Sequence, residues 1–329
     1  MHVARRNATR ARMKRAIVDL PAASRKRFSR RPVVRGASQV YSCPQVSPLP
    51  VLIMAVLATT YSGPIVRFAT APAVAIAFWR LALVLPVTFG LATREPQVRA
   101  VREAFWLMLL SGLLLAVHFW TWIASLRFTT VASSVLLVSL KPIFAWVLGA
   151  LWLGEHPGRA ERWGIVVAVV GATLIGLSDA RLSLGALGGD ALALIGAVTG
   201  AGYYVIGRRV RQTVGVWSYA SAVYAVAAVA LGVVAAFRGA PLTGFGPSDW
   251  GVFAAMAAGP MLVGHTGMNY ALQHFRATTV NVAALGEPVG ATLIAWLVPA
   301  IHEVPTPRAL VGGMLVLVGI GLSVGRGRR

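Results

Sequence analysis

Residues 104–126 read AFWLMLLSGLLLAVHFWTWIASL, an apolar run that contains no Asp, Glu, Lys or Arg. A helix needs roughly 20 mainly apolar residues to cross the hydrocarbon core of a bilayer, and this run is long enough. Its apolar residues are continuous, whereas the strands of a membrane barrel alternate between apolar and polar residues. The run therefore predicts a transmembrane helix.

Similar runs follow one another along most of the chain, separated by short polar breaks. Of the 329 residues 57% are hydrophobic and 12% are charged, which is far too apolar for an ordinary soluble domain. We therefore predict an all-α, polytopic membrane protein with ten transmembrane helices. The predicted spans are residues 49–67, 71–92, 104–126, 130–153, 163–178, 189–207, 215–237, 250–272, 278–300 and 309–325.

The sequence also excludes several kinds of site. Cys43 is the single cysteine, so an internal disulfide, a cysteine metal cluster and a CxxC redox pair are excluded. The motifs HExxH, GxSxG and GxxxxGK[ST] are absent from the sequence. We therefore expect no cofactor, no metal and no catalytic residue.

The formal net charge of +21 is concentrated at one end, because residues 1–47 hold twelve of the 31 Lys and Arg residues. Such a segment is typical of a disordered cytoplasmic tail. It lacks interleaved aromatic residues, so we expect no nucleic-acid partner, although contact with anionic lipid headgroups is compatible with its charge. Its Arg-rich, acid-poor composition is also typical of an organellar transit peptide, and whether it belongs to the mature protein stays open.

The remaining basic residues predict how the chain is oriented in the membrane. With the N-terminus in the cytoplasm, the cytoplasmic segments carry 24 Lys and Arg residues and the opposite side carries five. Both termini are therefore predicted to be cytoplasmic. The excess of Arg over Lys is typical of a GC-rich genome and favours a bacterial inner membrane.

Residues of the first half recur in the second half at a nearly constant offset. Each copy holds five spans, so the second copy enters the membrane from the opposite side. Residues 49–178 and 189–325 are therefore predicted to be inverted repeats, an arrangement typical of alternating access, with the substrate near the midplane. The matched pairs are His118 and His265, Pro142 and Pro288, Glu155 and Glu303, Gly164 and Gly312, Gly171 and Gly319 and, more weakly, Tyr61 and Tyr203.

The repeated segments are Lys141-Pro142-Ile143-Phe144-Ala145-Trp146 with Leu153-Gly154-Glu155, and Gly286-Glu287-Pro288-Val289-Gly290-Ala291 with Glu303. They resemble the fourth and ninth helices of the EamA branch of the drug/metabolite transporter (DMT) superfamily, and Phe78-Trp79-Arg80 is also similar to that family. The resemblance covers roughly residues 49–325. It implies a secondary carrier, often an exporter, of amino acids and related metabolites, without an ATP site. Lys141 departs from the family, where a neutral or acidic residue is expected, and Pro299-Ala300-Ile301-His302 contains a two-residue insertion.

Arg80, Lys141 and Glu287 are the formally charged residues well inside the predicted spans. Each would cost about 2.5–3.5 kcal/mol at the bilayer centre, so each should face the bundle interior and have a partner. We predict that Lys141 and Glu287 share the central cavity, where they pair with the carboxylate and the ammonium of a zwitterionic substrate. A structural ion pair is the alternative. Arg80 is interpreted as structural.

Polar and aromatic residues complete the predicted cavity. His118 and His265 each begin a helical face that continues four residues later, at Trp122 and Asn269. An intramembrane histidine is able to carry a coupling proton, or simply to pack through hydrogen bonds. The predicted cavity residues are Tyr61, His118, Trp122, Lys141, Tyr203, His265, Asn269 and Glu287.

The predicted structural or gating residues are Arg80, Pro142, Glu155, Pro288 and Glu303. The prolines are expected to kink their helices and to act as hinges or as static bends, because proline lacks a backbone N–H. The two glutamates end their helices at the membrane surface, where gating, capping and plain solvation are alternatives.

The predicted function is secondary transport, in the direction of export, of amino acids or similar small polar metabolites across the bilayer. An integral membrane enzyme that acts on a lipid or lipid-linked substrate is the alternative, with His118, His265 and Glu287 in catalysis; it lacks a nucleophile or metal constellation. A receptor or assembly factor is a third alternative. The identity of the substrate, the coupling ion and the oligomeric state are not predicted.

Overall fold

The computed structural model describes residues 47–66, 68–95, 97–129, 134, 137–177, 187–297 and 304–324, and the regular elements among them are helices. This all-α architecture was predicted. The α-helices are α3 (Pro48–Thr59), α4 (Ser62–Val66), α5 (Ala73–Ala82), α6 (Leu85–Ala92), α7 (Val98–Glu103), α8 (Phe105–Phe128), α10 (Lys141–Leu148), α11 (Arg159–Leu177), α12 (Leu187–Val210), α13 (Val216–Phe237), α14 (Pro247–Met256), α15 (Thr266–Ala271), α16 (Ala277–Ala284), α17 (Gly286–Leu297) and α18 (Pro307–Val324), and the π-helical segments are η1 (Gly149–Leu153) and η3 (Ala257–His265).

Six helical segments of the described residues are long and apolar enough to cross a bilayer. They coincide with six of the ten predicted spans. The other four predicted spans fall on helices that are interrupted, that begin with charged residues or that reach into residues outside the described ranges. The six segments are Pro48–Val66, Ala73–Ala92, Phe105–Phe128, Leu187–Val210, Val216–Phe237 and Pro307–Val324.

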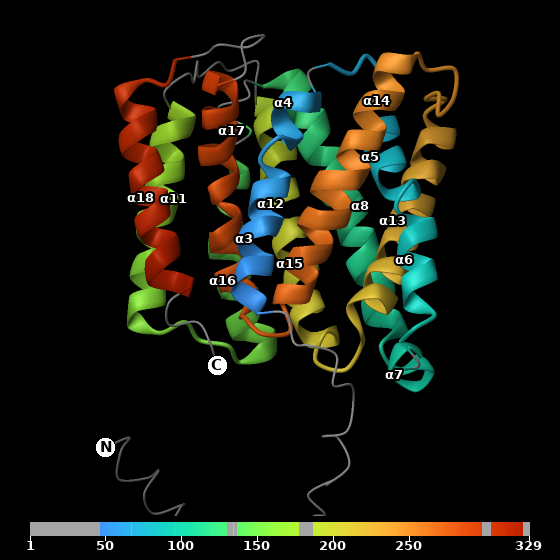
Figure 1. Cartoon of the computed structure of the whole chain (residues 1–329), viewed down its shortest axis with the longest axis horizontal. Coiled ribbons are helices and arrows are strands. Elements are labelled where there is room, and N and C mark those ends of the chain that lie inside the picture. Colours follow the sequence, from blue (N-terminus) through green and yellow to red (C-terminus); the bar gives the residue numbers. More distant parts are fainter. Residues whose placement is uncertain are drawn as a thin grey trace, which may run out of the picture. The chain divides into compact units, whose positions relative to one another are not determined.

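Large apolar side chains cover the outside of the helices. Trp106, Leu151 and Phe237 are 74%, 81% and 88% exposed. Water would oppose so much exposed apolar surface, whereas lipid tails solvate it. Figure 1 shows the helices running side by side.

The most extensive contacts between helices join the first half of the chain to the second half. α8 lies along α12, α5 along α13, α3 along η3 and α15, α10 along α16, and α11 along α18. Figure 1 shows α11 and α18 at one end of the bundle and α6 and α13 at the other. Helices of the two halves therefore pack against each other, and the residues buried between these helices form a core that both halves share.

Glycines allow α11 and α18 to pack closely. A Cβ atom added at Gly171 would lie 2.5 Å from the carbonyl oxygen of Gly312, and one added at Gly319 would lie 2.5 Å from the amide nitrogen of Ala168. Real Cβ atoms do not come this close, so a larger residue would push the helices apart. In lipid, where apolar burial gives little drive for association, such close packing is a main source of helix affinity.

Two carboxylates accept hydrogen bonds from backbone amides in the opposite half of the chain. Glu95, which follows α6, accepts hydrogen bonds from the amides of Trp217 (3.3 Å) and Ser218 (2.8 Å) in the first turn of α13. Asp249, in the first turn of α14, accepts from the amides of Thr70 (2.8 Å) and Ala71 (3.1 Å) just before α5. The amides at a helix start lack intrahelical partners, and negative charge is favourable there. Glu95 therefore caps α13, whereas Asp249 ties the segment before α5 to the start of α14.

Candidate functional site

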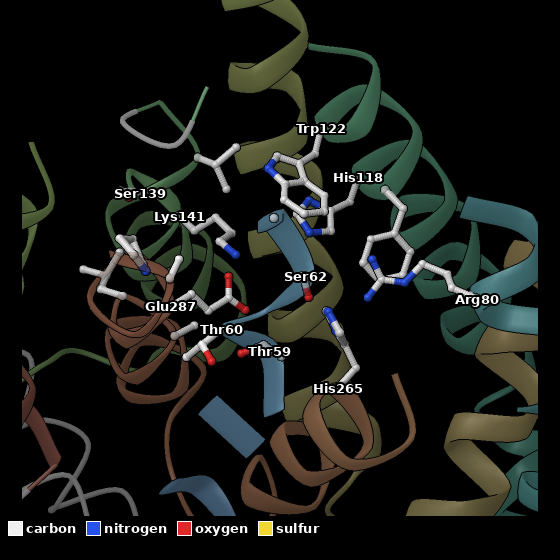
Figure 2. Close-up of a pocket in the computed structure, with 17 residues that line it drawn as sticks. Thr59, Thr60, Ser62, Arg80, His118, Trp122, Ser139, Lys141, His265 and Glu287 are labelled. Atoms are coloured by element: carbon white, nitrogen blue, oxygen red, sulfur yellow. The ribbon is translucent and has the colours of Figure 1, made fainter. Parts of the chain in front are cut away.

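A polar cavity of about 90 Å³ lies among helices of both halves. It is lined from the junction of α3 and α4, from α5, α8 and α10, from the end of η3, and from the junction of α16 and α17. Figure 2 shows the lining side chains converging from these elements. The labelled residues are Thr59, Thr60, Ser62, Arg80, His118, Trp122, Ser139, Lys141, His265 and Glu287.

Interrupted helices position three sides of the cavity. The chain turns at Thr60 between α3 and α4, at Leu140 just before α10, and at Leu285 between α16 and α17. Pro142 and Pro288 lie in the first turns of α10 and α17, where a missing N–H costs no intrahelical bond. The helices are thus broken next to both prolines, and a hinge role for them stays a prediction.

The three charged residues of the predicted spans all line this cavity. Arg80 is 1% exposed and Lys141 is 7% exposed. Figure 2 shows the Lys141 ammonium and the Glu287 carboxylate directed towards the same space, although no ion pair within 4.0 Å joins these two described residues. Placing Lys141 and Glu287 in one cavity agrees with the sequence interpretation, and their part in binding stays a prediction.

The two repeat-related histidines also line the cavity. His118 Nδ1 lies 2.7 Å from the carbonyl oxygen of Gly196, and because a carbonyl only accepts, Nδ1 carries the proton of this hydrogen bond. Gly200 gives the ring room, since a Cβ atom there would lie 2.8 Å from it. The rings of His265 and Phe119 are nearly perpendicular, with their centres 4.9 Å apart, and His265 Nδ1 lies 3.3 Å from Tyr204 Oη.

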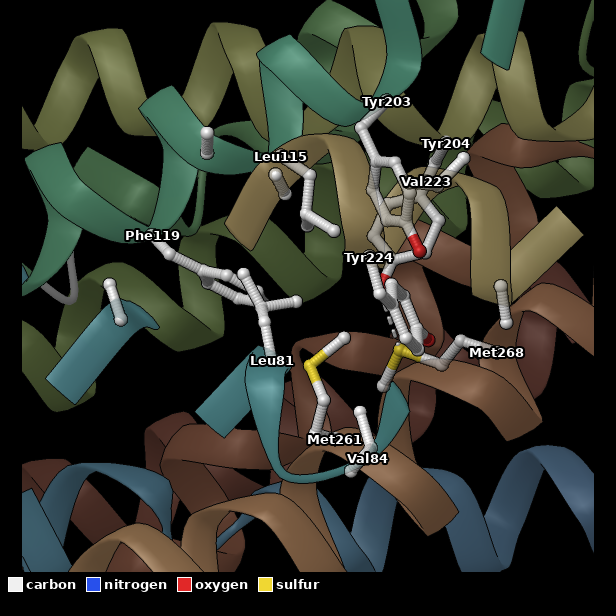
Figure 3. Packing of buried hydrophobic residues seen from close by; sticks show 14 of the residues in the cluster. Leu81, Val84, Leu115, Phe119, Tyr203, Tyr204, Val223, Tyr224, Met261 and Met268 are labelled. Carbon is white, nitrogen blue, oxygen red and sulfur yellow. Dashed lines mark hydrogen bonds between the residues drawn. The ribbon is translucent and has the colours of Figure 1, made fainter. Parts of the chain in front are cut away.

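Three of the eight predicted cavity residues lie outside the lining. Tyr203 donates to Asn269 Oδ1 at 2.7 Å, and the Asn269 amide donates to Tyr224 Oη at 3.2 Å, within a fully buried network. Figure 3 shows Tyr203 and Tyr224 packed in this part of the core. Tyr61 donates to the carbonyl of Ala255 at 3.2 Å. Trp122, in contrast, lies in the lining.

Sequence reasoning missed the small hydroxyl residues of the lining. Thr59 and Thr60 end α3 and donate back to the carbonyls of Val56 (2.8 Å) and Leu57 (2.7 Å), which leaves their oxygens able to accept from a ligand. The sequence carried a signal for them, because a Thr-Thr pair interrupts an otherwise apolar span. Ser139 had no comparable signal.

Glu155 lies at one end of the helices, away from the cavity lining. Its Oε1 accepts a hydrogen bond of 2.8 Å from Arg208 Nε, and Arg208 Nη1 also donates to the carbonyls of Leu272 (2.8 Å) and Gln273 (3.0 Å). Glu155 therefore ties the end of η1 to the ends of α12 and α15. Glu303 lies outside the described residues, and gating by either glutamate stays a prediction.

A helical bundle with a lipid-compatible surface and a charged internal cavity defines a multi-pass membrane protein. The family model of the EamA-like transporter family matches twice, at residues 47–177 and at residues 187–325. The chain belongs to this family, and its general activity is therefore membrane transport.

The chain is also similar to curated proteins and to solved structures. The Pseudopaline exporter CntI of Pseudomonas aeruginosa, in strains UCBPP-PA14 and PAO1, is 29% identical over 266 residues, which cover 78% of this chain and 87% of the exporter. One crystal structure covers 85% of this chain and 97% of its own chain with a TM-score of 0.72. At 16% identity, that structure shows a likeness of fold alone.

Proposed function

We propose that the protein is a secondary transporter that exports amino acids or similar small polar metabolites by alternating access. Ten transmembrane helices form two inverted five-helix repeats, residues 49–178 and 189–325, and the substrate binds in the cavity between them. The observation that carries this proposal is the cavity shared by the two halves, with Lys141 and Glu287 in its lining.

The two matches to one family model support the repeat, because each covers one proposed copy. The helix contacts support its inversion. α3 pairs with η3 and α15, whereas α12, which starts the second copy, pairs with α8 in the first. We take α12 of the second copy to correspond to α3 of the first, and η3 and α15 of the second copy to correspond to α8 of the first. The pairing of α3 with η3 and α15 is then equivalent to the pairing of α12 with α8, with the two copies exchanged. A two-fold axis between the copies produces such exchanged pairs.

The size of the cavity supports a cycle between different conformations. Pockets that bind small organic ligands usually measure about 300–1,000 Å³. At about 90 Å³, this cavity has room for a few water molecules, each with a share of about 30 Å³. A metabolite therefore needs the halves to separate on one side, and the interrupted helices beside Thr60, Leu140 and Leu285 are the proposed points of bending.

The comparisons favour a carrier over the alternative membrane enzyme, because the family and the relatives are transporters. The name of the relatives favours export as the direction. We place the protein in an inner membrane with both termini in the cytoplasm, as the distribution of Arg and Lys predicts. A proton is a candidate coupling ion, with His118 and His265 as its candidate carriers.

Reconstitution of the full chain into liposomes loaded with a panel of amino acids tests the proposal. The wild type should exchange labelled amino acid by counterflow, and Lys141→Ala and Glu287→Gln should each lower the flux at least tenfold. The matched control removes a charged side chain at the protein surface instead of in the cavity. Arg99 and Glu103 form an exposed ion pair of 2.9 Å in α7, so Arg99→Ala and Glu103→Gln should keep wild-type flux. Unchanged flux in both cavity variants would reject the proposed site, and hydrolysis or modification of a lipid without flux would favour the enzyme.

A further inference from the structure

Arg80 is buried without the hydrogen-bond partners that its side chain requires. The residue is 1% exposed, and among the described residues no acceptor reaches its Nε or Nη1. A guanidinium carries five N–H donors and stays charged, so buried and unsatisfied donors on it are costly. Figure 2 shows the guanidinium directed towards the centre of the cavity, where a ligand would meet it.

The contact that Arg80 does make leaves those donors free. Its Cζ lies 3.9 Å from the centre of the Phe119 ring, which is a cation–π contact. A ring face accepts no conventional hydrogen bond from these donors, because the N–H groups of a guanidinium point outward in the plane of the group. The ring contact therefore fixes where the guanidinium lies beside the cavity, while Nε and Nη1 stay buried and unpaired in this structure.

The cavity lining has more positive than negative charge. Arg80 and Lys141 supply two cations, and Glu287 is the acidic residue among the described lining residues. Lys141 also lies in the first turn of α10, where the helix dipole disfavours a cation and favours an anion. In the part of the chain that the structure describes, no ion pair within 4.0 Å satisfies either cation, so an anionic ligand would relieve both.

We infer that the cavity takes an organic anion with at least two carboxylate groups, one bound by the edge of Arg80 and one by Lys141, while an amine of the same ligand faces Glu287. This inference rests on the proposed transport function and names its substrate class. The bidentate geometry between a guanidinium and a carboxylate accounts for Arg80, which a zwitterion with a single carboxylate would leave unpaired.

Matched acid and amide pairs test the inference, because each pair differs by one carboxylate at nearly constant size. Counterflow in liposomes holding the full chain is measured with L-aspartate against L-asparagine and with L-glutamate against L-glutamine. The wild type should prefer the acids by about tenfold or more, as expected for a charged hydrogen bond. Arg80→Gln should lose that preference while still carrying the amides, and Arg80→Lys should keep part of it.

Arg238→Gln is the matched control for removing an arginine. Arg238 also lies over an aromatic ring, with its Cζ 5.4 Å from the centre of Trp120, but it does not line the cavity. This variant should keep the wild-type preference for acids. A loss of preference equal to that of Arg80→Gln would assign the effect to net charge and overturn the role of Arg80.

The remaining outcomes separate this inference from the proposed function. Amides carried as well as acids by the wild type would overturn the inference and leave transport standing. Transport of O-phospho-L-serine in preference to both acids would assign Arg80 to a phosphate and also overturn it. Flux of no panel member would overturn the proposed function together with the inference.

A second measurement covers the case in which Arg80→Gln fails to fold. A ligand that binds the native state raises the temperature of unfolding. In detergent, the wild type should therefore be stabilised more by L-glutamate than by L-glutamine at equal concentration. If L-glutamate and L-glutamine both bind and raise the unfolding temperature of the wild type equally, the inference is overturned. This measurement needs no variant.

Discussion

At the scale of single residues, charged side chains hold the helices together through specific acceptors and donors. Asp249 accepts two backbone hydrogen bonds and a third, of 2.8 Å, from the Thr70 hydroxyl. These bonds, the hydroxyl bond first, lower the pKa of Asp249 below its usual range although burial opposes them. Asp249 lies one residue before the predicted span 250–272, outside the membrane-spanning segments, so its ionised form depends on the pH of the surrounding water.

Asp249 gives the first prediction, a dependence of stability on pH. Because the folded-state pKa is below the unfolded value of about 3.9, the carboxylate stabilises the fold above that pH and loses this effect as the pH falls through the folded-state pKa. Asp249→Asn should therefore unfold at a lower temperature than the wild type at pH 7, and the difference should shrink below about pH 4. Thermal unfolding in detergent measures this. Glu103→Gln, which removes an exposed carboxylate, is the control, and a difference that stays constant with pH would contradict the prediction.

A double variant of Lys141 and Glu287 distinguishes the substrate site from a structural ion pair. If the two charges stabilise each other across the cavity, removing one leaves the other uncompensated, so Lys141→Met and Glu287→Gln should each destabilise the protein and the double variant should recover stability. We expect a coupling of about 0.5–3 kcal/mol in thermal unfolding. If the residues bind substrate, flux stays lost in the stable double variant. Recovered flux would assign them to structure alone.

At the scale of helices, steric fit at glycines decides which helices lie together. The carbonyl of Gly312 lies where a side chain at Gly171 would be, and among the described helices α11 and α18 form the pair with the most extensive contact. Gly321 lies on α18 as well, but a Cβ atom added to it meets nothing within 4 Å. The two positions therefore separate the effect of packing from that of replacing a glycine in a helix.

Gly171→Ala should destabilise the bundle by about 1–3 kcal/mol, the range for overpacking a close contact. Gly321→Ala should be neutral or slightly stabilising, because alanine favours a helix over glycine. Thermal unfolding of the two purified variants in detergent gives the comparison. Equal unfolding temperatures would mean that α11 and α18 do not approach as closely as described.

At the scale of the whole molecule, the proposed inverted repeat requires an even number of spans. Both chain termini must then lie on the same side of the membrane. Cys43 is the single cysteine and belongs to the N-terminal segment, so the native chain already carries one label site. A second site is obtained with Arg329→Cys in a Cys43→Ser background.

We expect a membrane-impermeant maleimide to label both sites in inside-out vesicles and neither site in intact spheroplasts. Detergent-solubilised protein is the control that both thiols react when they are accessible. Labelling of the two sites from opposite faces would contradict the even count of spans, and with it the inverted repeat that supports alternating access.

The periodic and compositional features of the chain were predictable from sequence, and the partners of individual side chains were not. Six predicted spans coincide with long apolar helices, because hydrophobic length is a local property of the sequence. His118, Trp122, Lys141, His265 and Glu287 were predicted for the cavity and line it. Charge in an apolar span is costly, so the charged residues among them stand out in the sequence itself.

The sequence by itself determined an all-α membrane protein of the EamA-like family with polar residues held inside it, because burying a charge or an unpaired backbone group in lipid is prohibitive. Tertiary structure alone decided which polar residues meet. Tyr203 and Asn269 face each other in a closed network, whereas Arg80, interpreted from sequence as structural, lines the cavity and keeps two buried donors unpaired. The physical reason is that the position of a residue along a helix determines which face of that helix it occupies. Which side chains it then contacts depends on the neighbouring helices.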